Sequence, residues 1–239
     1  MKNRVQTFLV RFKNPITFEQ TPALRSGVLK AMEYNANILF HNHADGETLR
    51  YAYPLIQYKR IQGKAAILGI GEGVNVIGEF LSHPTMQVLI DSHPVTLEIE
   101  RAIPRMTTAQ VWESEYRYTV RKWLPLNKDN YDRYRALSTD EQRITFLQRV
   151  LTANILSFFK GMGITVEREI KCCITQLTNG SLYKFKGTKL MAFDAEFTCN
   201  ASIPNYVGIG RHVSVGFGCV VACAADTARE HATPADDIQ

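Results

Sequence analysis

The sequence predicts an α+β protein with two tandem ferredoxin-like (RRM-like) domains, at residues 1–103 and 104–224, and a mobile tail at 225–239. Three observations support this fold class. The first half has the order strand, helix, strand, strand, helix, strand, which is the ferredoxin-like order. The second half follows that order without a clear second helix. Glycines gather where that helix would lie, at Gly208, Gly210, Gly216 and Gly218. We therefore expect a glycine-rich loop to replace or shorten it.

Short-range patterns place the elements of the first half in order. Residues 5–12 are rich in the β-branched and aromatic residues of a strand, and residues 22–32 have helical apolar spacing after the N-cap candidate Thr21. The remaining elements are strands at 37–43, near 51–58 and at 64–70, a short helix at 72–81, and a final strand or hairpin at 86–90 and 95–99. Residues 102–108, around Pro104, are a candidate linker.

The second half begins with an expected strand at 109–120. A long helix is expected within 131–160, where apolar residues form one stripe and Gly161 and Gly163 end it. Expected strands follow at 165–175, at 182–186 after an Asn-Gly turn, and at 191–199. The glycine-rich loop comes next and runs into an apolar strand at 217–222.

Composition is that of a globular protein of 239 residues, with 45% hydrophobic and 21% charged side chains. No apolar run reaches the roughly 18 residues that a membrane span requires. Five cysteines form no even disulfide framework. We therefore expect a cytoplasmic protein with reduced thiols, no membrane association and no zinc.

Positive charge is concentrated in the second half of the chain. Residues 101–225 carry seventeen basic and ten acidic side chains, a balance of +7, within a net charge of +5 for the whole chain. A basic surface favours a polyanion partner, because each neutralised phosphate releases counterions. Charge alone is weak evidence, so motifs must decide the function.

The glycine-rich stretch, residues 206–221, resembles the C-terminal loop of the CRISPR repeat-processing endoribonucleases of the RAMP superfamily. The shared shape is GxGRxxSxGFGCV, from Gly208 to Val220. A second block, at 40–43, 50–59 and 63–71, resembles the branch of that family with a histidine-based active site. The two blocks also have the order and separation that the family shows.

The resemblance implies an endoribonuclease that cleaves precursor CRISPR RNA within its repeats without a metal or other cofactor. Attack by the RNA 2′-hydroxyl would leave a 2′,3′-cyclic phosphate and a 5′-hydroxyl. The implied partner is CRISPR repeat RNA, as a hairpin or a single strand. Effector-complex subunits and a second copy of the chain are further options.

Two histidines are the candidate catalytic residues. His41 and His43 are one residue apart in an expected strand, so both imidazoles point to the same face. Histidine has an unperturbed pKa of about 6.5, so one ring can act as base and another as acid near neutrality. On spacing alone a surface pair or a zinc-related pair is the commoner interpretation, and the resemblance favours catalysis.

Two residues of the following strand complete the expected active site. Lys59 would stabilise the phosphorane, since cleavage needs a cation as well as an acid and a base. Tyr53 has the same strand parity and would orient a ribose or a base. Packing in the sheet is the alternative role for this tyrosine.

The glycine-rich loop is the candidate RNA-binding segment. Glycines let a ligand approach the backbone, so the loop's N–H groups could face phosphates. The expected RNA-binding residues of the loop are Gly208, Gly210, Arg211, His212, Ser214, Gly216 and Gly218. The alternatives are a plain β-hairpin and a loop that only packs the two domains together.

Two other functions stay open at this stage. One is a non-catalytic RNA-binding subunit of an effector complex, which would share the fold and the loop. The other is a zinc or magnesium hydrolase that uses the histidines. The His41 and His43 pair distinguishes the enzyme from the first, and cleavage in the presence of a chelator would exclude the second.

Overall fold

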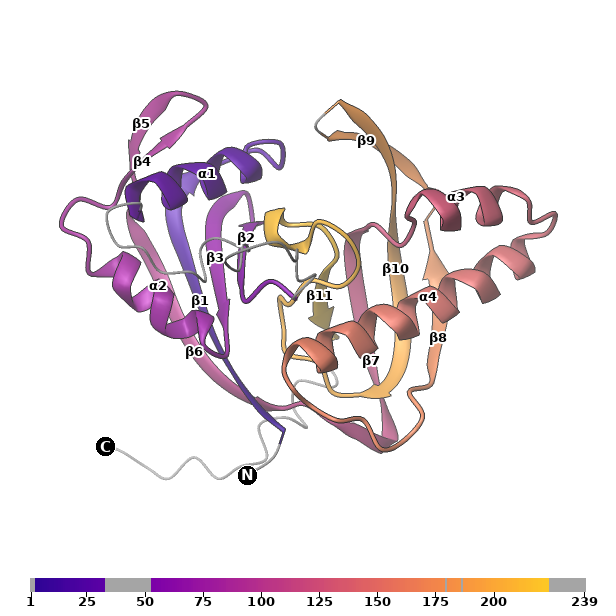
Figure 1. Cartoon of the computed structure of the whole chain (residues 1–239). Helices are drawn as coiled ribbons and strands as arrows, with labels where there is room; N and C mark the ends of the chain where they lie inside the picture. The colour runs from indigo at the N-terminus through magenta and orange to yellow at the C-terminus, as the bar shows by residue number, and fades with distance from the viewer. Residues whose placement is uncertain (1–2, 33–52, 179, 186, 224–239) are drawn as a thin grey trace, which may run out of the picture.

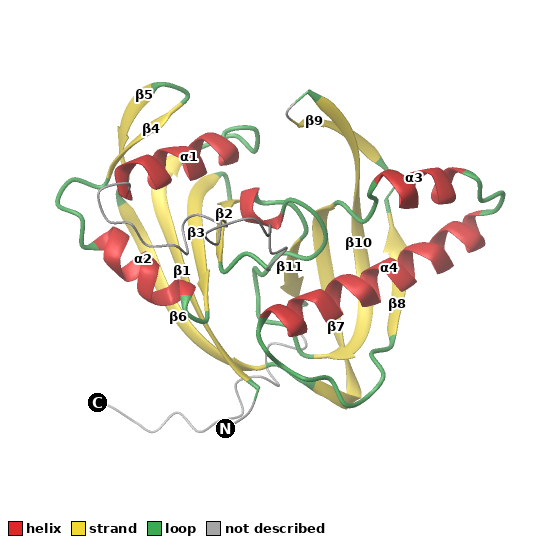
Figure 2. Cartoon of the chain, in the orientation of Figure 1, coloured by secondary structure: helices red, strands yellow, loops and turns green. Residues whose placement is uncertain are grey.

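The computed structural model describes residues 3–32, 53–178, 180–185 and 187–223. These form a four-stranded and a five-stranded sheet that lie side by side, each covered by helices on one face, and a separate two-stranded hairpin (Figure 1, Figure 2). Among the described residues, no helix is both long enough and apolar enough to cross a membrane. The strand expected at 37–43 and the tail expected at 225–239 lie outside the described residues.

The first domain has the ferredoxin-like topology. Its four strands have the antiparallel order β2-β3-β1-β6, and two helices cross between them. The bounds are β1 Arg4–Pro15, α1 Thr21–Met32, β2 Ile56–Ile61, β3 Lys64–Ile70, α2 Gly73–Leu81 and β6 Ile99–Thr108. The strand expected near 51–58 corresponds to β2, which begins and ends later in the sequence.

A hairpin and a long edge strand close this domain. The hairpin, β4 Gln87–Ile90 and β5 His93–Thr96, follows α2 and packs beside α1 (Figure 1). The expected linker at 102–108 is wrong, because those residues belong to β6 and pair with β1, Phe8 opposite Pro104. An edge strand tolerates proline, whose missing N–H can face away from the ladder. We propose that the domain boundary lies just after β6 and not at residue 103.

The second domain repeats the topology. Its sheet has the order β11-β7-β10-β8, and β9 pairs with an extension of β10. The bounds are β7 Val111–Trp123, α3 Lys128–Arg135, α4 Asp140–Gly161, β8 Cys172–Leu177, β9 Ser181–Phe185, β10 Thr188–Ala201 and β11 Cys219–Ala222. Between β10 and β11, where a second helix would lie, the only regular element is the three-residue 3-10 helix η1, Val213–Val215. The predicted fold class is confirmed.

One expected element of this domain is confirmed and another differs in detail. The long helix expected within 131–160 is α4, which begins behind Thr139 with a capping box in which Gln142 bonds back to the Thr139 backbone. The strand expected at 165–175 begins only at Cys172. The residues before it form the connection from α4.

The hydrophobic cores explain how the two domains are joined. One core lies between the first sheet and helices α1 and α2, and includes Val10, Phe12 and Ile67. The opposite face of the same sheet contributes Val5, Leu9, Ala66, Leu68 and Ile70 to the core of the second domain. Neighbouring β3 residues thus point alternately into two different cores. Strands β1 and β3 are thus packed on both faces of the first sheet, which fixes the second domain against it, whereas the edge strand β6 is largely exposed.

Candidate functional site

The candidate catalytic histidines, His41 and His43, lie outside the described residues. Their catalytic role stays a prediction. The other candidate residues lie on β2, just before it, and in the glycine-rich loop. Among the described residues, no three His, Cys, Asp or Glu side chains are grouped closely enough to hold a metal ion.

Lys59 lies on the face of β2 that points toward the glycine-rich loop. Ile56 and Tyr58 belong to the first core, so Gln57 and Lys59 point the other way. The Lys59 side chain is almost wholly buried, with 1% of its surface exposed. Its Nζ has no hydrogen-bond partner among the described residues.

Burial controls the charge of this amine. It lowers the pKa of Lys59 from its ordinary value, because the ammonium loses its hydration, and nearby Cys219 acts weakly in the opposite direction. An unpaired buried ammonium is unfavourable until an anion approaches it. A phosphate beside Nζ would therefore stabilise the ammonium, and the expected role of Lys59 at the phosphorane stays a prediction.

Tyr53 and Gln57 connect the first domain to Gly208 of the loop. The Tyr53 hydroxyl donates to the Gly208 carbonyl over 2.7 Å, and the Gly208 N–H donates to Gln57 Oε1 over 2.9 Å. Gln57 Nε2 donates to the Tyr53 hydroxyl over 2.9 Å and so closes the network. Burial raises the pKa of Tyr53, although its two hydrogen bonds act to lower it. Both polar backbone groups of Gly208 are thus bound by side chains 151 and 155 residues away in sequence.

Tyr53 also packs against the end of α4. Its ring meets Phe158 edge-on, with ring centroids 5.4 Å apart, and its Cβ lies where a side chain on Gly161 would be. This placement agrees with the packing role that we considered for Tyr53. Its expected contact with RNA stays a prediction.

The glycines of the loop are needed for close packing within the protein. A Cβ on Gly218 would lie 1.9 Å from the Ile209 carbonyl oxygen, and one on Gly208 would lie 2.5 Å from the Val213 Cβ. Gly218 also has φ +64°, a conformation that favours glycine. The N–H groups of Gly208, Gly216 and Gly218 all donate to acceptors in the chain. The expected phosphate contacts of these residues therefore stay a prediction, and the structure gives them a packing role.

The polar residues of the loop lie nearer to the surface. Arg211 is exposed, and its guanidinium donates to the Leu126 carbonyl over 2.9 Å, which leaves other N–H groups of the fork for a ligand. His212 is half-buried with φ +55°, and its ring centroid lies 4.7 Å from that of Phe185. Ser214 is half-buried in η1.

Gln57 and Lys122 have structural roles here that sequence reasoning missed. Gln57 ties β2 to the loop through contacts between residues far apart in the chain. Lys122 has a positive φ of 49°, and its ammonium lies over the rings of Phe18 and Tyr183. A single sequence shows neither the long-range pairing nor the unusual backbone angle.

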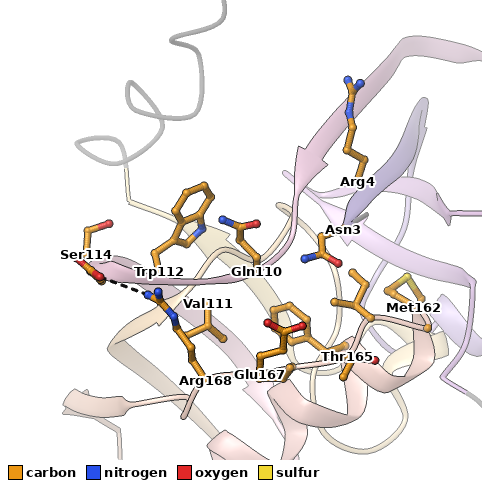
Figure 3. A pocket seen from close by; sticks show the side chains of 15 residues that line it. Asn3, Arg4, Gln110, Val111, Trp112, Ser114, Met162, Thr165, Glu167 and Arg168 are labelled. Carbon is orange, nitrogen blue, oxygen red and sulfur yellow. Dashed lines mark hydrogen bonds and ion pairs between the residues drawn. The ribbon is translucent and has the colours of Figure 1, made fainter. Parts of the chain in front are cut away.

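A wide groove lies away from these residues (Figure 3). This groove of about 920 Å³ lies between the start of β7 and the connection from α4 to β8. Its charged lining is mixed: a guanidinium nitrogen of Arg168 lies 3.5 Å from a carboxylate oxygen of Glu113, and Arg4 and Glu167 also line the groove (Figure 3). None of the candidate site residues that the structure describes lines it.

Comparison with known protein families gives two matches that together span nearly the whole chain. The model of the Cas6b N-terminal domain matches residues 3–107, and the model of the Cas6b C-terminal domain matches residues 110–223. Among curated proteins, an uncharacterized protein of Methanocaldococcus jannaschii is 40% identical over 102 residues, which are 43% of this chain and 68% of that protein.

Solved structures agree with the family models. A structure described as the crystal structure of Cas6b is 30% identical, has a TM-score of 0.82, and is aligned over 92% of this chain and 100% of its own. A second, described as a CRISPR RNA processing endoribonuclease Cas6b, is 29% identical with a TM-score of 0.70 and the same coverage.

Proposed function

The chain belongs to the Cas6b family, which confirms the resemblance to CRISPR repeat-processing endoribonucleases, and we propose that it cleaves precursor CRISPR RNA within its repeats. The observation that carries the proposal is the match of both halves of the chain, in order, to the two Cas6b domain models. The basic second half supports RNA as the partner.

The proposed chemistry uses the RNA's own 2′-hydroxyl as the nucleophile. His41 and His43 act as base and acid: one removes the proton from the 2′-oxygen, and the other protonates the departing 5′-oxygen. The oxygen–phosphorus bond to the 5′-oxygen breaks as the bond to the 2′-oxygen forms. The products carry a 2′,3′-cyclic phosphate and a 5′-hydroxyl, and no metal takes part.

Lys59 has the electrostatic role in this proposal. The phosphorane carries more negative charge than the phosphodiester, and a buried cation acts on it more strongly than a solvated one. The lowered pKa of Lys59 means that its proton is held less tightly before RNA binds. An incoming phosphate raises that pKa again, so RNA binding and protonation of Lys59 support each other.

The glycine-rich loop contributes RNA contacts through its polar residues. Arg211 is the strongest candidate for a phosphate contact, because its guanidinium is exposed and charged. Phosphate contacts position the RNA without reading its sequence. Association with effector subunits and formation of a homodimer stay predictions.

One assay tests the activity directly. The protein is incubated with repeat RNA from the CRISPR array of its own genome, with EDTA in excess. We expect one cut per repeat, with 5′ ends that a kinase can phosphorylate and 3′ ends that accept a tail only after the cyclic phosphate is removed. A preparation of the His41→Ala/His43→Ala variant controls for contaminating nucleases.

Two outcomes would point to the alternatives. Cleavage that requires added Mg²⁺ or Zn²⁺ would indicate a metal-dependent hydrolase. Tight binding of the repeat without any cleavage would indicate an RNA-binding subunit of an effector complex. Either result would overturn the proposed activity.

A further inference from the structure

A cluster of aromatic rings lines a cleft between the two domains. The cleft has a volume of about 490 Å³ and is lined mainly by apolar side chains. The first domain contributes residues just before and at the start of α1, and the second contributes β9 and residues next to η1. The lining residues are Phe18, Glu19, Pro22, Leu182, Tyr183, Lys184, Phe185, Val215 and Phe217.

The rings are held in a fixed arrangement around Phe217. Phe217 is buried, with 2% of its surface exposed, and it meets Phe18, Tyr183 and Phe185 edge-on at centroid distances of 4.9, 6.1 and 5.8 Å. The other three rings are half-buried. The exposed edges of these three rings line the cleft, and the Phe217 ring lies behind them.

Lys122 fixes two of these rings. Its Nζ lies 4.4 Å from the ring centroid of Phe18 and 4.1 Å from that of Tyr183, and it bonds to the Tyr183 hydroxyl over 2.5 Å. Cation–π contacts of this kind are strongest where water is excluded. A lysine from the second domain thus holds an aromatic ring from each domain in place.

The rim of the cleft is exposed and carries positive charge. Leu182, which lines the cleft, is 61% exposed. Lys184 lines the cleft, and Lys189 pairs with it across the β9–β10 hairpin. Both lysines are exposed, and Glu19 is the acidic residue of the lining. The hairpin extends beyond the body of the sheet (Figure 1).

We propose that this aromatic cleft receives an unpaired nucleobase of the RNA, with Lys184 and Lys189 on the adjoining phosphates. The proposal rests on the proposed function, since it names a subsite for the same RNA. Every base has a π-face that stacks on aromatic rings, and the phosphate beside it matches a lysine rim. An apolar peptide segment would fill the cleft as well, but it would make no use of the two lysines.

The cleft also lies beside the glycine-rich loop. A Cβ on Gly216 would lie 3.3 Å from the Phe18 ring and 3.4 Å from the Tyr58 carbonyl oxygen, so Phe18 packs directly on the loop. A base in the cleft would therefore be close to the segment that carries Arg211 and His212. This continuity favours one RNA strand passing over both.

The test uses the variant Tyr183→Ala/Phe185→Ala in the full chain, with Phe146→Ala as the matched control. Phe146 is a half-buried aromatic residue of α4 that packs on Tyr134 and does not line the cleft. The probes are repeat RNAs with 2-aminopurine at each unpaired position in turn, and the same RNAs with an abasic residue there. Binding is measured by fluorescence and by titration, and single-turnover cleavage is followed in parallel.

We expect wild-type protein and the control to quench 2-aminopurine at one unpaired position. The double variant should lose that quenching and bind the RNA about 5- to 150-fold more weakly, as the removal of base stacking does. An abasic residue at that position should weaken wild-type binding by a similar factor. It should not weaken binding to the double variant further.

Unchanged RNA affinity and unchanged quenching in the double variant would overturn the proposal. This also holds if the double variant loses binding to another protein, because the cleft would then bind protein and not RNA. A different result would overturn the proposed function on which this proposal rests: the wild-type protein would not cleave the repeat RNA. The two failures are distinguishable, because quenching is measured without cleavage. Circular dichroism of the variant and normal cleavage at saturating protein concentration exclude misfolding.

Discussion

At the scale of single residues, Lys59 is the side chain whose placement most needs a functional explanation. A lysine in a hydrophobic interface without a partner lowers the stability of the fold. Methionine would fill a similar volume without the charge. Lys59 therefore stands where function and stability are expected to conflict.

We expect Lys59→Met to stabilise the fold by about 1–3 kcal/mol at pH 7, the cost of an unsatisfied buried polar group. The folded-state pKa of Lys59 lies below its unfolded value, so the folded state binds fewer protons and stability rises with pH between the two pKa values. Lys59→Met should remove that rise. Thermal unfolding between pH 6 and pH 11 measures it.

Cleavage by Lys59→Met should fall, because the phosphorane would lose its buried cation. The control is Lys30→Met, which removes an exposed lysine on α1 and should change neither property by much. Equal stability of Lys59→Met and wild type at all pH values would show that the Lys59 ammonium is paired in solution.

The histidine pair gives the second prediction at this scale. His43→Ala should abolish cleavage and His41→Ala should impair it, because removing a general acid or base slows a reaction by roughly 10²–10⁴-fold. Both variants should still bind repeat RNA. Single-turnover rates at saturating protein concentration test this, and an unchanged rate in the double variant would place the catalysis elsewhere.

At the scale of elements, the glycine-rich loop combines a tightly packed backbone with an exposed arginine. Gly218 and Gly163 form a natural pair for testing the packing. Their φ values are +64° and +66°, but a Cβ on Gly163 would meet nothing within 4 Å, whereas one on Gly218 would meet the Ile209 carbonyl.

Alanine at either position is strained by the positive φ, which costs roughly 1–2 kcal/mol. Gly163→Ala should therefore lower the free energy of unfolding by about that amount. Gly218→Ala should lower it clearly further, because the Ile209 carbonyl must move and break its packing. Urea unfolding of both variants compares them directly. Equal losses would mean that the loop relaxes freely and that close packing does not explain its glycines.

Arg211 tests whether the same loop binds RNA. Arg211→Ala should weaken binding to the cognate repeat and to an unrelated hairpin by similar factors. It should also reduce the slope of log K against log salt by about one, since one phosphate contact is lost. Titrations at several salt concentrations measure both. Unchanged affinity and slope would favour a loop that only joins the domains.

The elements show what local sequence signals can and cannot predict. The sequence predicts residues 64–70 and 22–32 almost to the residue, because a strand pattern after Gly63 and a helix pattern behind Thr21 are local signals. β6 was missed because Pro104 indicates a break unless the strand is known to lie at an edge. The contact of Gln57 with Gly208 joins residues 151 positions apart and has no local signal at all.

At the scale of the whole molecule, the two ferredoxin-like units share buried surface. The first sheet contributes residues from both of its faces to two cores, and its inner face belongs to the core of the second domain. The candidate site lies along this junction: β2 supplies Lys59 and Gln57 from one side, and the glycine-rich loop meets them from the other. The geometry of the site therefore depends on the docking of the domains.

This sharing predicts that the domains unfold together. Leu24→Ala, in the core on the opposite face of the sheet from the second domain's core, should destabilise its own core by about 2–5 kcal/mol. Both tryptophans, Trp112 and Trp123, belong to the second domain, so their fluorescence reports on that domain alone. In a cooperative molecule the urea midpoint of tryptophan fluorescence should fall in Leu24→Ala together with the midpoint of far-UV circular dichroism. If the tryptophan midpoint stays at the wild-type value while circular dichroism shows an earlier transition, the domains fold independently.

The junction would then be a docking surface rather than a shared core, and Lys59 would be held in place by RNA binding as well as by the fold.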